Sequence, residues 1–268
     1  MKQEILLIGT DARFAPLFDL LHGAGWILRC HQVCQHPDDF FPASSFDEIR
    51  AVVLPLPSLL PDGSIRGTDA PKVFWEQLIS VVPASIPIFG GMLPKTPGHE
   101  LCDLLGDEVF ALKNALLTAE GATEILMNRA APLQAKRVLI TGFGRIASLL
   151  APRLRAMGME VSILARRPEV RAKCELSGFS LYRGTLSDYD VIINTVPAEV
   201  FSAEDLETVR KGCFLLELAS APGGFSPEGS RLHPVLKAPG IPASYAPHAA
   251  AQAEFDAILR TLEGGDGI

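Results

Sequence analysis

A glycine-rich segment directly after a short apolar run limits this chain to a small set of folds. The segment follows the pattern G-x-G-x-x-A at residues 142–147, behind the run Val138–Ile140. Gly142 permits a tight turn, Gly144 lets a phosphate approach the backbone, and the small Ala147 lets the next helix pack on the strand. The start of that helix offers N–H groups to an anion; a glycine turn without a ligand is the alternative. The predicted cofactor contacts in this turn are Gly142, Gly144, Arg145 and Ile146.

The end of the next strand distinguishes between the two nicotinamide dinucleotides. An NAD site usually carries Asp or Glu about 20 residues further on, bonded to the ribose hydroxyls. Here the run Val161–Leu164 is followed by Ala165-Arg166-Arg167, with no acidic residue at its end. Guanidinium groups suit a 2′-phosphate in charge and geometry, so these three residues predict NADP, with NAD as the alternative. A solvated helix start would explain the arginines without a ligand.

Two later loops belong to the same expected ligand edge. Asn194-Thr195-Val196-Pro197 ends the run Val191–Asn194, and Ala219-Ser220 with Pro222-Gly223-Gly224 follows Phe214–Leu218. In doubly wound sheets, ligands bind outside the carboxyl ends of the strands. We therefore expect residues 194–197 to contact the cofactor, and Ser220, Gly223 and Gly224 to contact the substrate, the two glycines through backbone N–H groups. Ordinary turn chemistry is the alternative for any one of them.

The remaining pattern predicts two domains, since 268 residues suit two α/β domains of about 100–150 residues each. Apolar runs that alternate with helical patterns are typical of parallel sheets covered on both faces. We predict an α/β fold of two doubly wound, Rossmann-like parallel-sheet domains with a cleft between them. Residues 1–117, flavodoxin-like or Rossmann-like and completed by a returning helix at 246–268, form the substrate domain, and residues 118–245 bind the dinucleotide. The predicted strands are Ile5–Ile8, Trp26–Cys30, Ala51–Leu54, Ile86–Phe89, Glu108–Leu112, Lys136–Thr141, Val161–Leu164, Leu181–Tyr182, Val191–Asn194, Phe214–Leu218 and Val235–Lys237, and the helices are Ala12–Leu21, Lys72–Val82, Thr118–Ala130 and Ala246–Leu262.

Composition argues against several other classes of protein. The net charge of −7, without a basic block, disfavours a nucleic-acid partner, because phosphate binding needs clustered Lys and Arg. No apolar run approaches the roughly 18–20 residues that span a bilayer, and the start of the chain lacks signal-peptide features. Five irregularly spaced cysteines suit free thiols in the cytoplasm. Cys30-His31, Cys34 and His36 resemble half of a zinc site, but no second Cys/His pair follows, so we expect no metal.

Several segments together resemble the A subunit of dipicolinate synthase from spore-forming bacteria. They occur in that family's order and cover almost the whole chain, and the first and last are more specific than the glycine-rich turn. The sequence departs from the family at Gly9-Thr10, where Gly-Gly is expected, and at His248-Ala249-Ala250, where a Lys and then Ala/Thr-Gly are expected. The matching segments are Ile8–Arg13, Val53–Pro57, Thr118–Gly121, Gly142–Arg145, Ile192–Pro197, Leu218–Ser220 with Pro222–Gly224, and Ala238–Pro242 with Ala246-Pro247.

The resemblance implies an enzyme subunit that oxidises dihydrodipicolinate to dipicolinate, with NADP as the hydride acceptor. It also implies a partner, which is a smaller, flavoprotein-like B subunit, and the mother-cell cytoplasm of a sporulating bacterium as the setting. A homo-oligomer is compatible with it.

The substrate of that reaction carries two carboxylates, so its site should offer cations or N–H groups at two points. Arg13 follows the first strand at the expected ligand edge, and its guanidinium can bind two oxygens at once. Thr118, as the first residue of a long helix, would place a helix N-terminus at a second point. An exposed surface arginine is the alternative for Arg13.

Loss of a hydride must be followed by loss of a proton, and two residues are candidates to accept it. His248 opens the last helix and has a near-neutral reference pKa; it would alternatively bind a carboxylate as the imidazolium. Glu120 is the other candidate, and it would otherwise be a first-turn acid that complements the helix dipole. Water is the third possible acceptor, since the aromatic product makes this step strongly downhill.

Two further functions remain open at this point. One is a non-catalytic dinucleotide-binding subunit that regulates its partner. The other is a related dehydrogenase for another small carboxylate, such as an amino acid or a 2-hydroxy acid. Such sites usually need a His–acid pair or a catalytic lysine, and Lys95 is the only lysine near a predicted strand end of the first domain.

Overall fold

Residues 3–33, 46–69 and 71–264 are described by the structure, which is a computed structural model. The chain divides into unit 1, Met1–Asn114 with Ala243–Ile268, and unit 2, Ala115–Pro242. The divisions fall within helices α3 (Glu108–Arg129) and α7 (Ile241–Tyr245). The predicted boundaries, at 117/118 and 245/246, lie three residues further along the chain.

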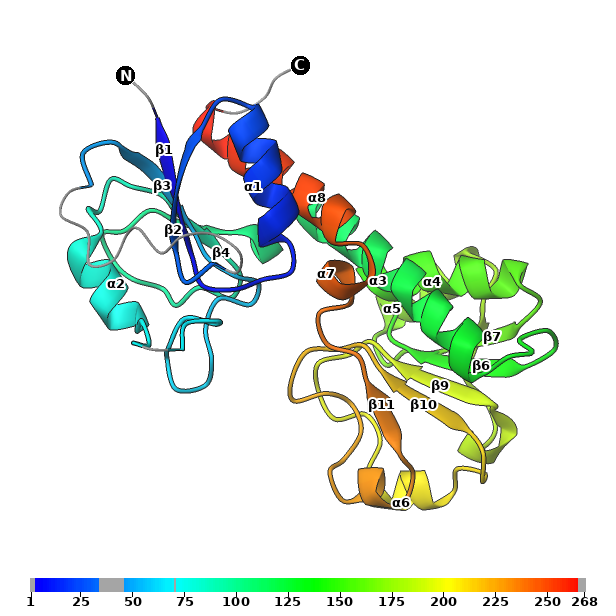
Figure 1. The fold of residues 1–268 in the computed structure, drawn as a ribbon. Helices are drawn as coiled ribbons and strands as arrows, with labels where there is room; N and C mark the ends of the chain where they lie inside the picture. Colours follow the sequence, from blue (N-terminus) through cyan, green and yellow to red (C-terminus); the bar gives the residue numbers. More distant parts are fainter. Residues whose placement is uncertain (1–2, 34–45, 70, 265–268) are drawn as a thin grey trace. The chain divides into compact units, whose positions relative to one another are not determined.

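Unit 1 is a parallel five-stranded sheet in the order β2-β1-β3-β4-β5, which is the flavodoxin-like order. Figure 1 labels β1 to β4 of this sheet. Its order reverses beside β1, so the carboxyl ends of β1 and β3 form the expected ligand edge. Its elements are β1 (Glu4–Ile8), α1 (Phe14–Gly23), β2 (Ile27–His31), β3 (Ile49–Val53), α2 (Trp75–Val81), β4 (Ile88–Gly90), β5 (Leu101–Asp103), η1 (Leu104–Gly106), the first turns of α3, and α8 (Pro247–Leu262).

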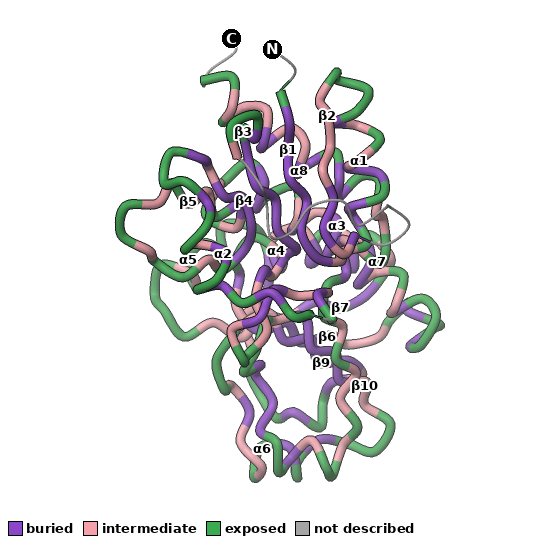
Figure 2. The backbone as a smooth tube through the Cα atoms, turned by 60° about the vertical axis from the view of Figure 1, so that its left-hand side comes forward, coloured by how far each residue is buried: buried purple, intermediate pink, exposed green. Residues whose placement is uncertain are grey.

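The apolar run of β1 is buried along its whole length (Figure 2), because helices pack on both faces of the sheet. Ile5 and Leu7 belong to the core that contains residues of α1 and α8. Leu6 and Ile8 point the other way, into the core that contains residues of α2. This alternation is the period of a strand. The return of the C-terminal helix to the first domain is therefore confirmed.

Unit 2 is a parallel six-stranded sheet in the order β11-β10-β9-β6-β7-β8. This is the Rossmann order, and its switch point lies between β6 and β9. Residues from α3 and α4 cover one face, and residues from α6 cover the other. Its elements are the rest of α3, β6 (Arg137–Thr141), α4 (Arg145–Ala156), β7 (Glu160–Leu164), α5 (Pro168–Leu176), β8 (Ser180–Leu181), η2 (Leu186–Asp188), β9 (Val191–Asn194), α6 (Ala203–Glu207), β10 (Phe214–Glu217), η3 (Gly229–Arg231) and β11 (Val235–Lys237).

One predicted strand is wrong, and one helix begins earlier than predicted. Residues 108–112 form the first turns of α3. The carboxylate of Asp107 accepts the backbone N–H of Phe110 at 2.8 Å, which caps the helix there. The fifth strand is instead Leu101–Asp103. Thr118 therefore lies in the interior of α3, and the helix N-terminus predicted at this residue does not exist.

Candidate dinucleotide site

The glycine-rich turn has the backbone geometry that its sequence predicts. Gly142 has φ of +73°, and its amide donates to the carbonyl of Leu164 at 2.8 Å, which joins the ends of β6 and β7. A Cβ at Gly142 would lie 2.9 Å from Val196 Cγ2, so this position has no room for a side chain. A Cβ at Gly144 would meet nothing within 4 Å, so its backbone is open to an approaching group.

Helix α4 begins directly after this open backbone. Gly144 is its N-cap, and no side chain of the described residues caps it. The first-turn amides of Ile146 and Ala147 therefore have no partner within the helix, and they suit a phosphate. Ala147 is fully buried, as close packing of helix on strand requires. These features fit a dinucleotide pyrophosphate.

Two arginines follow the neighbouring strand. Arg166 and Arg167 come directly after β7, and both are exposed. Arg167 is the N-cap of α5, and its guanidinium lies 3.4 Å from the Glu169 carboxylate. Arg166 has no such partner in the described residues. The end of β7 therefore carries a cation available to a 2′-phosphate, with no carboxylate of its own at residues 165–167.

A buried hydrogen-bond network joins the ends of the three central strands of unit 2. Asn194 receives a 2.5 Å hydrogen bond from the Thr141 hydroxyl at its Oδ1, and its Nδ2 donates to Glu217 Oε1 at 2.6 Å. Glu217 also accepts the amides of Ala219, at 3.0 Å, and Gly224, at 2.7 Å. The network ties the loops after β6, β9 and β10 to one another beside the glycine-rich turn.

Glu217 is a residue of this edge that sequence reasoning missed. The sequence signal for it is an acidic residue at the end of the apolar run Phe214–Glu217, where burial of a charge is costly unless the charge is hydrogen-bonded.

The substrate-binding roles predicted for the amides of Gly223 and Gly224 are wrong. Gly224 donates its amide to Glu217, and Gly223 donates its own to the Ser220 carbonyl at 3.0 Å, so neither N–H group can be offered to a substrate.

The remaining predicted residues of these loops lie at the same edge in different environments. The Asn194 amide is fully buried, and all its hydrogen bonds are internal; Val196 is one of its partners. Thr195 donates its hydroxyl to the Thr141 carbonyl at 2.7 Å and is half-buried. Pro197 and Ser220 are exposed, and Ala165 is half-buried. Asn194 and Thr195 therefore position the loop, whereas Pro197 and Ser220 are accessible to a ligand.

In unit 1, Arg13 lies at the switch point of the sheet, as predicted, but it is not an exposed cation. Its side chain is only 4% exposed, and Nη1 lies 2.9 Å from Asp11 Oδ2. The same Asp11 oxygen accepts the amide of Leu56, at 3.1 Å, in the segment that follows β3. Asp11 thus links the segments that follow β1 and β3 and pairs with the guanidinium.

The two candidate proton acceptors differ in their exposure and in whether they already form an ion pair. His248 is exposed in the first turn of α8, in unit 1. Glu120, in unit 2, belongs to the interior of α3 and not to a first turn, and its carboxylate lies 3.6 Å from the Arg153 guanidinium. The predicted helix-dipole role of Glu120 is therefore wrong. Thr118 is buried in the same helix interior.

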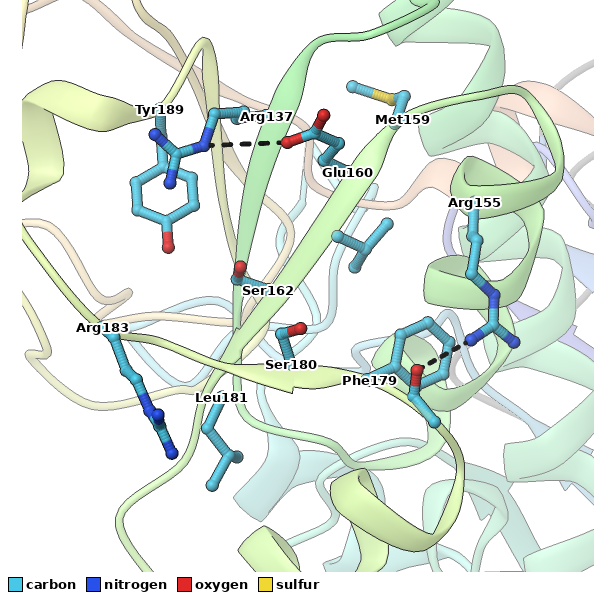
Figure 3. Close-up of a pocket in the computed structure, with 12 residues that line it drawn as sticks. Arg137, Arg155, Met159, Glu160, Ser162, Phe179, Ser180, Leu181, Arg183 and Tyr189 are labelled. Atoms are coloured by element: carbon cyan, nitrogen blue, oxygen red, sulfur yellow. Dashed lines mark hydrogen bonds and ion pairs between the residues drawn. The ribbon is translucent and has the colours of Figure 1, made fainter.

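A hollow of about 510 Å³ in unit 2 lies away from this edge (Figure 3). Arg137 and Glu160, the first residues of β6 and β7, line it, so it opens near the amino ends of the strands. Two of its three arginines are already engaged: Arg137 lies 4.0 Å from Glu160, and Arg155 donates to the Gly178 carbonyl at 3.0 Å and stacks over Phe179, whereas the third, Arg183, is exposed. This hollow is not the dinucleotide site.

No cluster of three or more His, Cys, Asp or Glu side chains suited to a metal occurs in the part of the chain that the structure describes. Cys34 and His36 of the weighed zinc motif lie outside the described residues. Within the described residues, no helix is long and apolar enough to cross a membrane.

Comparison with known protein families identifies the type of unit 2. Residues 116–222 match the family described as D-isomer specific 2-hydroxyacid dehydrogenase, NAD binding domain. Unit 2 is therefore a dehydrogenase-type domain that binds a nicotinamide dinucleotide. No curated protein sequence matches the chain.

Comparison with solved structures covers both units. The A subunit of dipicolinate synthase from Bacillus halodurans is 22% identical, with a TM-score of 0.83 and 97% of each chain covered. The A chain of dipicolinate synthase from Bacillus subtilis is 22% identical, with a TM-score of 0.82, and 98% of this chain and 96% of that one are covered. A D-3-phosphoglycerate dehydrogenase-like oxidoreductase from Ralstonia solanacearum is more distant, at 14% identity and a TM-score of 0.61, with 98% and 95% covered. The resemblance seen in the sequence is thus confirmed at the level of the fold.

Proposed function

We propose that this chain is an oxidoreductase subunit that oxidises dihydrodipicolinate to dipicolinate, with NADP as the hydride acceptor. The observation that carries the proposal is the likeness of fold to two dipicolinate synthase structures over almost the full length of each chain. Several of the family-like segments, such as Ile8–Arg13, Gly142–Arg145 and Ile192–Pro197, run from strand ends into the loops at the ligand edges of the two sheets, whereas Thr118–Gly121 lies inside helix α3. The proposal therefore rests on agreement between fold and loop sequence.

The residues of unit 2 would hold the cofactor by its phosphates. The open backbone at Gly144 and the amides of Ile146 and Ala147 would bind the pyrophosphate. Arg166 would bind the 2′-phosphate, because its guanidinium is exposed and pairs with no carboxylate of residues 3–33, 46–69 or 71–264. When bound, the nicotinamide would supply the acceptor for one hydride. Residues 194–197 would border that end of the cofactor, held in place by the Glu217 network.

The substrate would lose a hydride from a ring carbon and then a proton, which leaves an aromatic pyridine dicarboxylate. In unit 1, the Arg13 guanidinium would attract a substrate carboxylate, with Asp11 fixing its orientation. His248 is the stronger candidate to take the proton or to bind the second carboxylate, because it is exposed and unpaired in the described residues. Glu120 is the weaker candidate, because its carboxylate already lies 3.6 Å from the Arg153 guanidinium.

A smaller, flavoprotein-like B subunit is the proposed partner, and the cytoplasm of a sporulating mother cell is the proposed setting. Both follow from the resemblance. A regulatory subunit that binds the dinucleotide without turnover is the outcome that the experiment below must exclude.

The match of residues 116–222 to 2-hydroxyacid dehydrogenases favours a second candidate, a dehydrogenase for a 2-hydroxy acid. That chemistry needs a general base oriented by a carboxylate. His248 pairs with no carboxylate in the described part of the chain, so this candidate ranks second.

The test is an assay of the purified chain, alone and with the candidate B subunit, on freshly generated dihydrodipicolinate. Dipicolinate absorbance and nicotinamide reduction are followed with NADP and NAD side by side. We expect equimolar product and reduced NADP, and loss of product in Arg13→Ala but not in Arg50→Ala, which removes an exposed arginine of β3. Tight NADP binding without product in any combination would contradict the proposal and favour the regulatory function. Turnover of 2-hydroxy acids instead would establish the second candidate.

A further inference from the structure

Helix α8 carries a carboxyl group into an apolar layer of unit 1. Glu254 has no exposed surface, and the helix residues around it, Ala251, Ala253, Ala257 and Ile258, are buried in the core shared with α1 and β1. Carboxyl groups are rarely found in such surroundings unless hydrogen bonds or a charge compensate for the loss of water. Helix α8 packs directly against α1, whose N-cap is Arg13.

Hydrogen bonding sets Glu254 and Arg13 apart from the other buried polar groups. Neither oxygen of Glu254 has a hydrogen-bond partner in the described part of the chain, and neither does Nε of Arg13, although all three atoms are buried. Among the described residues only four buried side-chain atoms lack a partner, and the fourth is Nδ1 of His99. An unsatisfied donor and an unsatisfied acceptor on two helices that pack together are complementary, and buried groups of this kind need an explanation.

The charged groups that affect the pKa of Glu254 are Arg13 and Asp11, at the start of α1. Burial raises the pKa of Glu254 to about 8; the positive charge of Arg13 opposes this rise, and the negative charge of Asp11 adds to it. The ion pairs that join α8 to α3, Lys113–Asp256 and Arg260–Asp107, do not involve Glu254. At neutral pH Glu254 is therefore mainly a neutral acid, and the Arg13–Asp11 pair beside it has no net charge.

We infer that Glu254 is a positioning residue for Arg13, whose protonation state sets how strongly that guanidinium attracts a carboxylate ligand. When Glu254 is neutral, Asp11 is the only carboxylate that Arg13 balances. When Glu254 ionises, it accepts the Nε–H of Arg13, and two carboxylates then surround one guanidinium. The net charge of the three side chains falls from 0 to −1, which repels a carboxylate ligand in this weakly screened interior.

The inference rests on the proposed function in one respect, the carboxylate ligand at the β1–β3 edge. It predicts that ligand binding keeps Glu254 protonated. Since one proton is then linked to binding, affinity falls about tenfold between pH 7 and pH 9, around a midpoint near pH 8. Above pH 8 the protein should take up a proton from the buffer as the ligand binds.

Calorimetric titration of the full chain with dipicolinate tests this, at pH 7, 8 and 9 and in two buffers of different ionisation enthalpy. Wild type should lose affinity about tenfold over this range, with proton uptake at the higher pH. Glu254→Gln keeps the shape and cannot ionise, so it should bind at pH 9 as well as wild type binds at pH 7. Asp256→Asn, which removes a partly exposed carboxylate two residues along the same helix, should keep the wild-type profile. A profile unchanged by Glu254→Gln, or a flat wild-type profile, would overturn the inference.

A second measurement needs no ligand and separates this inference from the proposed function. The NMR signal of the Arg13 Nε–H group, assigned with Arg13→Lys, should shift with a midpoint near pH 8 in wild type and not in Glu254→Gln. A signal that does not respond to pH overturns the link between the two residues. A responding signal in a chain that binds no dipicolinate supports the link and overturns the proposed substrate.

Discussion

The side-chain amide of Asn194 donates a 2.6 Å hydrogen bond to the buried carboxylate of Glu217, and this contact joins the ends of β9 and β10. A Cβ at Gly224 would lie 2.3 Å from Asn194 Cγ, so the glycine loop must pass directly against this pair. The contact therefore shapes the loops on both sides of it.

Glu217→Gln should weaken the hydrogen-bond network at the carboxyl ends of β9 and β10. Glu217 accepts three hydrogen bonds, whereas an amide in its place would set N–H groups against the N–H groups of Asn194 or Gly224. We expect a loss of about 2 kcal/mol in the free energy of unfolding and weaker dinucleotide binding. Denaturant unfolding and dinucleotide titration measure the two effects. The exposed Glu228→Gln, in the loop that follows, is the control; equal stability of both variants would show that the network contributes nothing.

Gly144→Ala should weaken dinucleotide binding without lowering the stability of the fold. Its φ of −84° is open to any residue, and an added Cβ meets nothing within 4 Å, so stability should not change. The methyl group would instead occupy the approach of the pyrophosphate, and we expect dinucleotide affinity to fall at least about tenfold. Gly142→Ala is the contrasting variant, because φ of +73° and the close Val196 side chain should lower stability by about 1–2 kcal/mol. Unimpaired binding in Gly144→Ala would place the cofactor elsewhere.

Arg166→Ala should weaken NADP binding and leave NAD binding almost unchanged. A charge-assisted contact to the 2′-phosphate is worth about 2 kcal/mol, or about 30-fold in dissociation constant. Arg167→Ala should have a smaller effect, because that guanidinium already faces Glu169. Titrations of both nucleotides by fluorescence provide the comparison. An equal loss of affinity for NADP and for NAD would mean that Arg166 does not contact the 2′-phosphate.

The stability of the protein should carry a pH dependence that Glu254→Gln removes. The pKa of Glu254 is raised from 4.5 to about 8 by burial, so the native state binds this proton more tightly than the unfolded state does. The stabilisation is complete below pH 4.5 and is lost as pH rises to about 8, with an upper bound of about 5 kcal/mol. Denaturant melts of wild type and variant between pH 5 and 9 should therefore show wild type losing stability relative to the variant as pH rises. A constant difference would show that Glu254 is ionised throughout.

Local patterns were sufficient for most of the fold. The run Ile5–Ile8 and the pattern at residues 142–147 each act within a few residues, through apolar burial and the φ that Gly142 needs. Residues 108–112 were misread as a strand because a short apolar run fits either period. The side chain of Asp107, which caps the helix, was the overlooked signal.

The sequence by itself determined the two parallel sheets, the returning C-terminal helix and the dinucleotide turn, because periodicity and glycine stereochemistry depend on neighbouring residues. Only the tertiary structure decided which polar groups remain for a ligand. In the folded chain the Gly224 amide donates to Glu217, Arg13 is buried beside Asp11, and Glu254, near the C-terminal end of the sequence, lies in the core beside α1. Hydrogen-bond partners and burial depend on contacts between distant segments, and no local pattern encodes them.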